Sequence, residues 1–352
     1  MWGSGLREAG FNMMANSKKP VVVVSSNARL FASFFDSERA DRLSLMTDWK
    51  RNPAHTITPA LRRDLRDAEA LITTWDSPQF FPEDLVNWAP RLRLIAHCGG
   101  TVKTRFARSL FDRLVITNAP DPMTRHVAEL AVTFLLYLAR DVDTYREELR
   151  RPSNAVYQAL HLSGGGEQTI LGSQVGMIGF GRIGRAIHHF LAPFGTRLLV
   201  HDPYVDKAST SPLVRFATLE EVLASSRFLV VAAGLTEQTT GLLNRKRLRM
   251  LPRGAAIINV ARGGIIDLDA LTPMVLSGRL RCALDVTDPA EPLPLRHPLR
   301  RADGAILTPH VGAISCSVRH EMASVILSDV ERFFAGKAVE NRVTSAMLDR
   351  MT

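Results

Sequence analysis

The sequence has few cysteines, and they lie far apart. Cys98, Cys282 and Cys316 form no C-x-x-C pair, and each falls in or beside an apolar run. This spacing favours buried thiols in a reducing compartment over a disulfide framework, and no metal site is predicted.

Long apolar runs are missing as well. No uncharged apolar stretch reaches the length of a membrane span, and residues 1–19 lack the apolar core of a signal peptide. We therefore expect a cytoplasmic protein with no membrane partner, in which residues 1–19 form a disordered N-terminal extension.

Lysine is scarce, so the positive charge comes mainly from arginine. Only seven of the 44 basic residues are lysine, and the net charge is +9. The sequence contains no block rich in lysine and arginine and no aromatic interleaving typical of RNA-binding proteins. Arginine scattered over solvated faces is therefore favoured over a nucleic-acid surface, and its field would attract anionic small molecules.

A chain of 352 residues is long for one hydrophobic core and favours two domains. Strand-like runs alternate with helical ones in two series, the pattern of α/β domains. Strands of the first series are expected at 20–25, 70–74, 92–96 and 114–118. A long amphipathic helix, 124–146, and an irregular stretch, 151–172, follow. Strands of the second series are expected at 175–179, 197–201, 227–232, 254–260, 281–285 and 304–308.

The first strand of the second series ends in a G-x-G-x-x-G turn and is followed directly by a helix. This arrangement holds the pyrophosphate of a dinucleotide, because one glycine permits the turn, one lets the backbone approach the phosphates, and one lets the helix pack on the strand. The helix N-terminus offers N–H groups to the anion. The predicted cofactor-binding residues of this turn are Gly179, Gly181, Arg182, Ile183 and Gly184.

An acidic residue, Asp202, ends the next strand. Its carboxylate can accept hydrogen bonds from the ribose hydroxyls of adenosine and would repel a 2′-phosphate. The sequence therefore predicts NAD(H) as the cofactor rather than NADP(H).

Three polar residues follow apolar strands of the second series: Arg262, Glu291 and His310. In such folds the carboxyl ends of the strands face the ligand crevice. Arginine can bind a carboxylate and polarise a carbonyl, histidine can exchange a hydroxyl proton, and a neighbouring carboxylate can fix the imidazole. Together they suit a 2-hydroxy acid and its 2-keto partner. Asp285, also at a strand end, is placed to bind the nicotinamide.

Structural roles remain open for two of these residues. Arg262 could cap a helix or pair with Asp267, although Gly263 and Gly264 after it favour close approach of the backbone to a ligand. Glu291 alone could be a solvated loop carboxylate.

At this point the chain resembles the D-isomer-specific 2-hydroxyacid dehydrogenase family, whose members include phosphoglycerate, glyoxylate/hydroxypyruvate and D-lactate dehydrogenases. The matching segments occur in the family's order between about residues 92 and 312. They are 118–120 with 127–129, 175–184, 201–204, 236–242, 259–264, 284–286, 291–294 and 308–310.

The resemblance implies a role for each strand-end residue. Arg262 would bind the substrate carboxylate and carbonyl, His310 would be the acid/base, and Glu291 would tune His310. The residues implied to surround the cofactor are Thr239, Val260 and Asp285. The family also implies a homodimer, built through the nucleotide domain and the segment near 124–170.

Two departures from the family pattern are visible. Glu291 lies six residues after Asp285, whereas the family usually has five, so the loop has gained a residue. The substrate loop, commonly Gly-x-Gly-Val-Asp, is Gly-Gly-Thr-Val-Lys at 99–103. The backbone of Gly100, Thr101 and Val102 can still bind the carboxylate. Lys103 would either alter the charge near the substrate or point to solvent, and we expect the latter.

We therefore predict an α/β protein with two Rossmann-like domains. A doubly wound NAD-binding domain, 123–312, is inserted in a smaller, discontinuous, flavodoxin-like substrate domain, 20–122 and 313–352. The predicted function is NAD(H)-dependent transfer of a hydride between nicotinamide and C2 of a small D-2-hydroxy or 2-keto acid. Two alternatives stay open: an NAD-sensing, corepressor-like interaction protein on the same scaffold, and a nucleic-acid binder, which rests on net charge alone.

Overall fold

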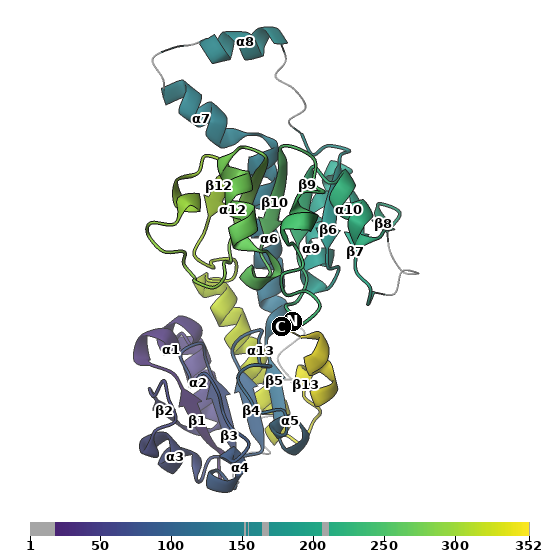
Figure 1. Cartoon of the computed structure of the whole chain (residues 1–352). Coiled ribbons are helices and arrows are strands. Elements are labelled where there is room, and N and C mark those ends of the chain that lie inside the picture. Colours follow the sequence, from purple (N-terminus) through teal and green to yellow (C-terminus); the bar gives the residue numbers. More distant parts are fainter. Residues whose placement is uncertain (1–17, 151–152, 154, 164–168, 206–210, 352) are drawn as a thin grey trace, which may run out of the picture. The chain divides into compact units, whose positions relative to one another are not determined.

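The computed structural model describes residues 18–150, 153, 155–163, 169–205 and 211–351. The chain divides into two compact units, each built on a mainly parallel β-sheet with helices (Figure 1). Unit 1 comprises Met1–Pro120 and Arg319–Leu348, and unit 2 comprises Asp121–Val318 and Asp349–Thr352. The predicted fold class, two parallel-sheet α/β domains, is confirmed. The units meet in sequence at 120/121 and 318/319, whereas we predicted 122/123 and 312/313. The expected N-terminal extension lies almost entirely outside the described residues.

Unit 1 contains a six-stranded sheet with the order β13-β5-β4-β3-β1-β2. All its strands pair in parallel except β13, which runs antiparallel to β5. Without β13, the order 2-1-3-4-5 is that of flavodoxin-like sheets. The strands are β1 (Val21–Ser25), β2 (Asp48–Asn52), β3 (Ala70–Thr73), β4 (Leu94–His97), β5 (Val115–Asn118) and β13 (Arg342–Val343). The helices are α1 (Ala28–Phe34), α2 (Ser37–Met46), α3 (Pro59–Leu65), α4 (Leu85–Trp88), α5 (Leu110–Arg113) and most of α13 (Cys316–Phe334).

Unit 2 contains a seven-stranded parallel sheet with the order β12-β11-β10-β9-β6-β7-β8. The order reverses beside β6, as in dinucleotide-binding sheets of order 3-2-1-4-5-6. The strands are β6 (Gln174–Ile178), β7 (Arg197–His201), β8 (Val214–Phe216), β9 (Phe228–Val231), β10 (Ala255–Asn259), β11 (Leu280–Leu284) and β12 (Ala305–Leu307). The crossover helices are α9 (Arg182–Leu191), α10 (Leu219–Ser225), α11 (Arg245–Leu248) and α12 (Leu268–Leu276). Six of these seven strands were predicted.

The single long helix predicted at 124–146 is two helices. Helix α6 spans Pro120–Ala139 and α7 spans Val142–Arg150. Asp141 between them has φ 51°, a left-handed conformation that a continuing α-helix cannot contain. The stretch 151–172, predicted to be irregular, contains helix α8 (Ala155–Ser163) among its described residues. No helix in the described part of the chain combines the length and the apolar character needed to cross a bilayer.

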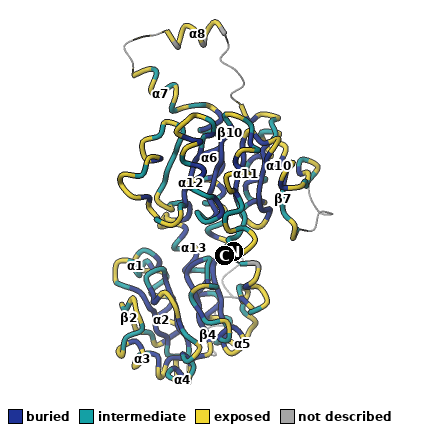
Figure 2. Tube along the Cα trace, viewed as in Figure 1, coloured by how far each residue is buried: buried dark blue, intermediate teal, exposed yellow. Residues whose placement is uncertain are grey.

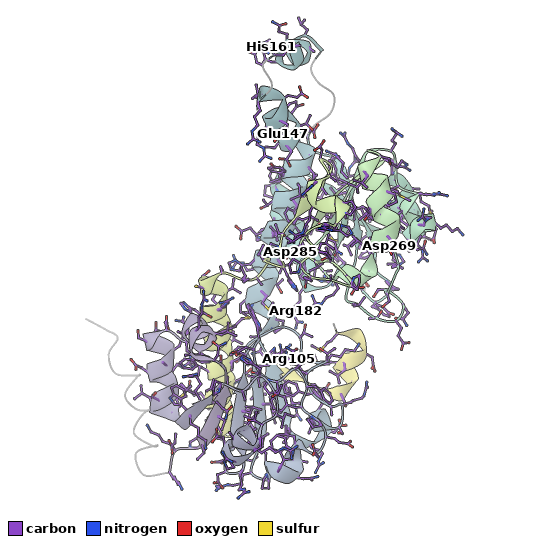
Figure 3. The ribbon with its side chains drawn as sticks, turned by 60° about the vertical axis from the view of Figure 1, so that its left-hand side comes forward. Arg105, Glu147, His161, Arg182, Asp269 and Asp285 are labelled. Carbon is purple, nitrogen blue, oxygen red and sulfur yellow. The ribbon has the colours of Figure 1, made fainter. Side chains whose placement is uncertain are left out.

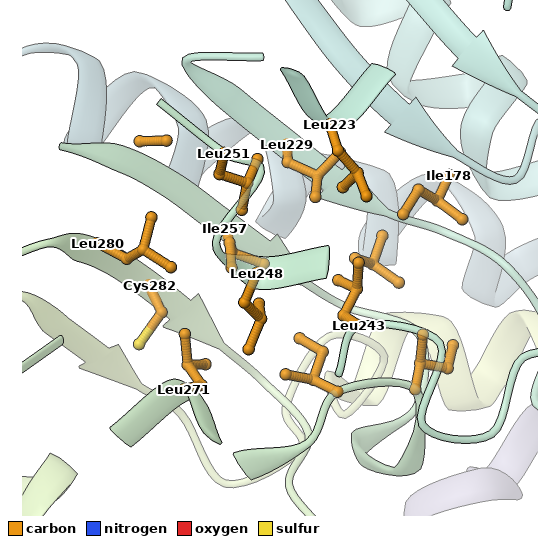
Figure 4. Packing of buried hydrophobic residues seen from close by; sticks show 14 of the residues in the cluster. Ile178, Leu223, Leu229, Leu243, Leu248, Leu251, Ile257, Leu271, Leu280 and Cys282 are labelled. Atoms are coloured by element: carbon orange, nitrogen blue, oxygen red, sulfur yellow. The ribbon is translucent and has the colours of Figure 1, made fainter. Parts of the chain in front are cut away.

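The cores of both units lie on their sheets. The central strands β3, β4, β9 and β10 are buried along their whole length, as expected when helices cover both faces of a parallel sheet (Figure 2). Unit 2 has two apolar clusters, one containing Leu229 and Ile257 and the other containing Val230 and Ile258. Since neighbouring residues of a strand point to opposite faces, the clusters belong to the two faces of the sheet. Figure 4 shows the first cluster.

Candidate active site

The loop after β12 holds His310 in an unusual backbone conformation. The φ of His310 is 55°, in the left-handed region that residues with a Cβ seldom adopt. The backbone N–H of His310 donates to the Asp285 carbonyl at 2.8 Å. Residues in this conformation cluster at functional sites, where the surrounding structure must hold them in place.

The carboxylate of Asp285 provides that hold. Asp285 follows β11 and is only 2% exposed. Its Oδ1 accepts the Val311 N–H at 2.8 Å and the Thr308 hydroxyl, and its Oδ2 accepts the Gly312 N–H at 3.0 Å. Both carboxylate oxygens therefore anchor the His310 loop, a role that we did not predict. A contact between Asp285 and nicotinamide remains a prediction.

His310 pairs with the carboxylate expected from the sequence. Its Nδ1 lies 2.9 Å from Glu291 Oε2, and Glu291 Oε1 accepts the Thr287 N–H at 3.2 Å. This bond fixes the orientation of the ring and leaves Nε2 as the nitrogen available for proton exchange. Glu291, rather than Ala290 at the usual family spacing, therefore contacts the imidazole.

Arg262 follows β10, the strand next to β11 in the sheet. Its Nη1 donates to the Ala261 carbonyl at 2.7 Å, and its own carbonyl accepts from Asn259 Nδ2 at 2.9 Å. Burial lowers the pKa of the Arg262 guanidinium, and the charge of Glu291 partly opposes this change. The structure thus brings Arg262 within electrostatic reach of the carboxylate that binds His310.

The helix-capping role considered for Arg262 is not seen in the structure. Its side chain does not cap the 3-10 helix Gly263–Ile265, and Asp267 instead caps α12 by accepting the Ala270 N–H at 2.9 Å. The backbone of Gly263 does approach another group closely, as expected, but that group belongs to the protein and not to a ligand. A Cβ at Gly263 would lie 2.2 Å from the carbonyl carbon of Thr287. This glycine lets the loop of Arg262 pack on the loop of Glu291.

The three glycines of the turn after β6 differ in their surroundings. Gly179 has φ 89°, and a Cβ there would lie 2.6 Å from the Ala233 backbone. A Cβ at Gly184 would lie 2.7 Å from the Gly179 carbonyl oxygen, so this glycine allows α9 to pack on the turn. Gly181, which precedes α9, has open space where its Cβ would be. The turn therefore leaves room for a ligand at Gly181 and has none at the other two.

Of the remaining predicted cofactor residues, Asp202 contacts this turn, whereas Arg182 and Thr239 have partners elsewhere in the described part of the chain. Asp202 Oδ2 accepts the Phe180 N–H at 2.7 Å, so the carboxylate contacts the glycine turn directly. Arg182, exposed at the start of α9 (Figure 3), pairs with Asp121 at 2.8 Å. Thr239 Oγ1 accepts the Thr236 N–H at 2.7 Å and donates to the Gly234 carbonyl at 2.7 Å. Two apolar members, half-buried Ile183 and buried Val260, complete the set.

The family model of the D-isomer specific 2-hydroxyacid dehydrogenase NAD binding domain matches residues 132–312, a segment with the glycine turn and all three strand-end residues. This chain belongs to the D-isomer specific 2-hydroxyacid dehydrogenase family. The matched segment of unit 2 is the family's NAD-binding domain. The predicted family, its NAD-dependent oxidoreductase class and its cofactor type are therefore confirmed.

Relatives of this dehydrogenase family extend the likeness beyond the NAD-binding domain. The chain is 30% identical to the glyoxylate reductase of Thermococcus kodakarensis over 285 residues, which cover 79% of this chain and 83% of that protein. It is 36% identical to human glyoxylate reductase/hydroxypyruvate reductase over 208 residues, 58% of this chain and 62% of that protein. The crystal structure of the TT0316 protein from Thermus thermophilus has a TM-score of 0.74 and 28% identity, covering 92% of this chain and all of the other.

Within unit 1, the predicted substrate loop of this family member follows β4. The Asn118 side chain donates to the Gly100 carbonyl at 2.6 Å, and the Ala119 N–H donates to the Gly99 carbonyl at 3.0 Å. Val102 is fully buried, whereas Thr101 and Lys103 are half-buried. The loop is thus tied to the end of β5, and Lys103 is less solvated than we expected.

A groove in unit 2 lies beside the His310 loop. It has a volume of about 260 Å³ and is lined by one face of α6 and by the residues after His310. The lining residues are His126, Glu129, Leu130, Thr133, Val311, Gly312, Ile314 and Ser315. The predicted acid/base therefore lies next to a concave surface of its own unit.

Proposed function

We propose that this protein is an NAD(H)-dependent dehydrogenase that interconverts a small D-2-hydroxy acid and the corresponding 2-keto acid. The observation that carries the proposal is the His310–Glu291 pair with Arg262 in electrostatic reach of the same carboxylate. These groups meet the needs of the reaction, which are a proton donor with a fixed ring and a cation for the carboxylate and the developing oxyanion.

The described residues fit an NAD site. The open position at Gly181 lies at the N-terminus of α9, where backbone N–H groups can bind the pyrophosphate. Asp202, held against the same turn, would accept hydrogen bonds from the adenosine ribose and repel a 2′-phosphate. These features support NADH over NADPH. The family resemblance adds Thr239, Val260 and Asp285 to the residues around the cofactor.

The roles of the chain's residues follow from these contacts. NADH, when bound, would supply the hydride for C2 of the 2-keto acid. Arg262 would bind the carboxylate, and the backbone of Gly100, Thr101 and Val102 remains a predicted substrate contact. His310 would donate the Nε2 proton to the C2 oxygen while Glu291 stabilises the charged ring. The products are the 2-hydroxy acid and NAD⁺, and the reverse reaction returns the proton to His310.

A screen of 2-keto acids tests this function directly. Loss of NADH absorbance is followed with glyoxylate, hydroxypyruvate, pyruvate, phenylpyruvate and phosphohydroxypyruvate, each with NADPH in a parallel assay. We expect turnover with at least one acid and a preference for NADH. Tight NADH binding without turnover of any acid would instead favour the corepressor-like function.

We also propose that the protein is a cytoplasmic homodimer. Helices α7 and α8 expose large apolar side chains, with Leu149 72% and Leu162 89% exposed, and no residue of α7 is buried. A second copy would cover this apolar segment, since exposed apolar clusters mark interaction sites. Sedimentation equilibrium of the wild type should give twice the chain mass, and Leu149→Glu with Leu162→Glu should shift the protein toward monomer.

A further inference from the structure

Unit 1 contains two arginines whose buried nitrogens lack partners. Arg105 lies in the segment after the substrate loop (Figure 3), and its Nη2 donates to the Trp75 carbonyl at 3.1 Å. Arg319 of α13 has its guanidinium carbon 4.7 Å from the centre of the Trp75 ring, and its Nη1 donates to Ser33 at 2.9 Å. Arg105 Nη1 and Arg319 Nε are buried and have no hydrogen-bond partner in the structure. We call Arg105, Arg319 and Trp75 the arginine cluster.

The positive charge of this cluster is not balanced by contact with acids. Among the described residues, neither guanidinium forms an ion pair. Asp76 is close enough to oppose the lowering of the Arg105 pKa by burial. Its carboxylate is nevertheless already used, because it accepts from Ser26 and Thr74 hydroxyls and from the Asn27 N–H at 2.7 Å. The acid near Arg105 is therefore already engaged by other donors.

The cluster lies against the predicted substrate loop. A Cβ at Gly99 would be 2.5 Å from His97 Nε2 and 3.1 Å from the Trp75 indole nitrogen. Both side chains therefore touch the first glycine of the loop. Burial and the charge of Arg105 lower the pKa of His97 to about 3, so His97 is neutral at physiological pH and adds no charge. The two arginines therefore add positive charge next to this loop, which itself contains Lys103.

An anion is the natural occupant of such a cluster. A buried polar group without a partner costs free energy, and each such group in a folded protein requires an explanation. Arginine presents its N–H groups in a fixed fork that matches carboxylate and phosphate oxygens. The loops after β3 and β4 lie at the carboxyl ends of parallel strands, where ligands bind in these folds.

We propose that the arginine cluster binds a second anionic group of the substrate, so that the enzyme prefers 2-keto acids with a distal carboxylate or phosphate. This inference rests on the proposed function. It extends that function because the carboxylate at C1 is already assigned to Arg262.

The test compares matched substrate pairs. For a distal carboxylate, kcat/KM is measured for 2-oxoglutarate and 2-oxopentanoate. For a distal phosphate, it is measured for 3-phosphohydroxypyruvate and hydroxypyruvate. The wild type should prefer the acid with the second anionic group in at least one pair, and the preferred pair identifies that group. Arg105→Met and Arg319→Met should each lower that preference about ten-fold or more, since each removes a charge-assisted hydrogen bond.

The matched control is Arg62→Met. Arg62 lies in the same unit over the ring of Trp88 at 4.9 Å, so this variant also removes an arginine from a tryptophan face, but outside the cluster. It should keep the wild-type preference. If Arg105→Met does not fold, Arg105→Lys, which keeps the charge and loses the fork, should give an intermediate preference.

Several results would overturn the inference. One is a wild type that shows no preference for the acid with the second anionic group in either pair. Another is an Arg105→Met variant in which kcat/KM falls equally for both members of a pair, which would mean that the cluster has only a structural role.

Failure of the proposed function is distinguishable, because the wild type would then turn over none of the acids. In that case the cluster is tested with succinate and inorganic phosphate in thermal unfolding. One of these anions should raise the Tm of the wild type and of Arg62→Met more than that of Arg105→Met. Equal shifts in all three proteins, or no shift in any, would reject an anion site.

Discussion

The two units share one architecture and differ in how the polar groups near their predicted sites are partnered. Around the predicted acid/base of unit 2 the polar groups are satisfied: Asp285 anchors the His310 loop, and His310 binds Glu291. In unit 1 the guanidinium groups of Arg105 and Arg319 keep buried nitrogens without partners. A network of satisfied groups holds a reactive side chain in one orientation, which suits chemistry. Positively charged donors without partners suit the recognition of an anionic ligand, because the ligand supplies the missing acceptors.

Replacing His310 has the largest expected effect and tests the chemical half of this comparison. His310→Gln should lower kcat by roughly 10²–10⁴-fold, because the amide cannot exchange the proton at neutral pH. The dissociation constant of NADH, measured by fluorescence titration, should change little. A variant with kcat near that of the wild type would reject His310 as the acid/base.

Removing the anchor should damage both the stability and the activity of unit 2. Asp285→Ala leaves the N–H groups of Val311 and Gly312 without their acceptor, which should lower the free energy of unfolding by about 3 kcal/mol. Urea unfolding measures the loss. Asp285→Asn keeps one acceptor and should lose less. If both variants unfold like the wild type, the carboxylate does not hold the His310 loop.

Substitutions at two glycines of unit 2 distinguish a role in packing from a role in cofactor binding. In Gly263→Ala the new Cβ would meet the Thr287 backbone at 2.2 Å, so we expect a loss of about 2 kcal/mol in unfolding free energy and a displaced Glu291 loop. Gly181→Ala is the matched control, because open space surrounds that position. It should change stability by less than about 0.5 kcal/mol and weaken NADH binding. Equal loss of stability in both variants would contradict the packing role of Gly263.

The burial of each strand explains how well the sequence could predict it. Central strands such as β9 and β10 are buried on both faces, so they appear as continuous apolar runs and were located closely. Strand β2 reads Asp-Trp-Lys-Arg-Asn and lies at the sheet edge, while β8 and β13 have three and two residues, so none carries that signal. The break at Asp141 was not predicted, because apolar residues continue at helical spacing across it and 124–146 therefore looked like one helix.

For the site, motif order identified Arg262, Glu291 and His310 as a group. Asp285 was assigned to the cofactor because spacing cannot show that its oxygens accept from residues 23 to 27 positions away. The Trp75–Arg319 contact joins residues far apart in sequence, and no local pattern reveals it. A polar residue that ends a buried strand, as Asn259 and His97 do, is the signal that could have pointed to such partners.

The smallest effect that we predict concerns acid stability and tests whether unit 1 keeps its histidine neutral. His97 is buried, its Nδ1 lies 2.9 Å from the Thr73 hydroxyl, and its pKa is lowered from 6.5 to about 3. Below pH 6.5 the histidine of the unfolded chain binds a proton, whereas His97 in the folded protein stays neutral down to about pH 3. The free energy of unfolding therefore falls as the pH falls from 6.5 to about 3. Between pH 7.5 and pH 5.5 the loss should be about 1.4 kcal/mol. His97→Gln should remove this part of the pH dependence in urea unfolding, whatever its stability at pH 7.5. An unchanged slope would mean that His97 accepts a proton in the folded protein and adds a third positive charge beside the substrate loop.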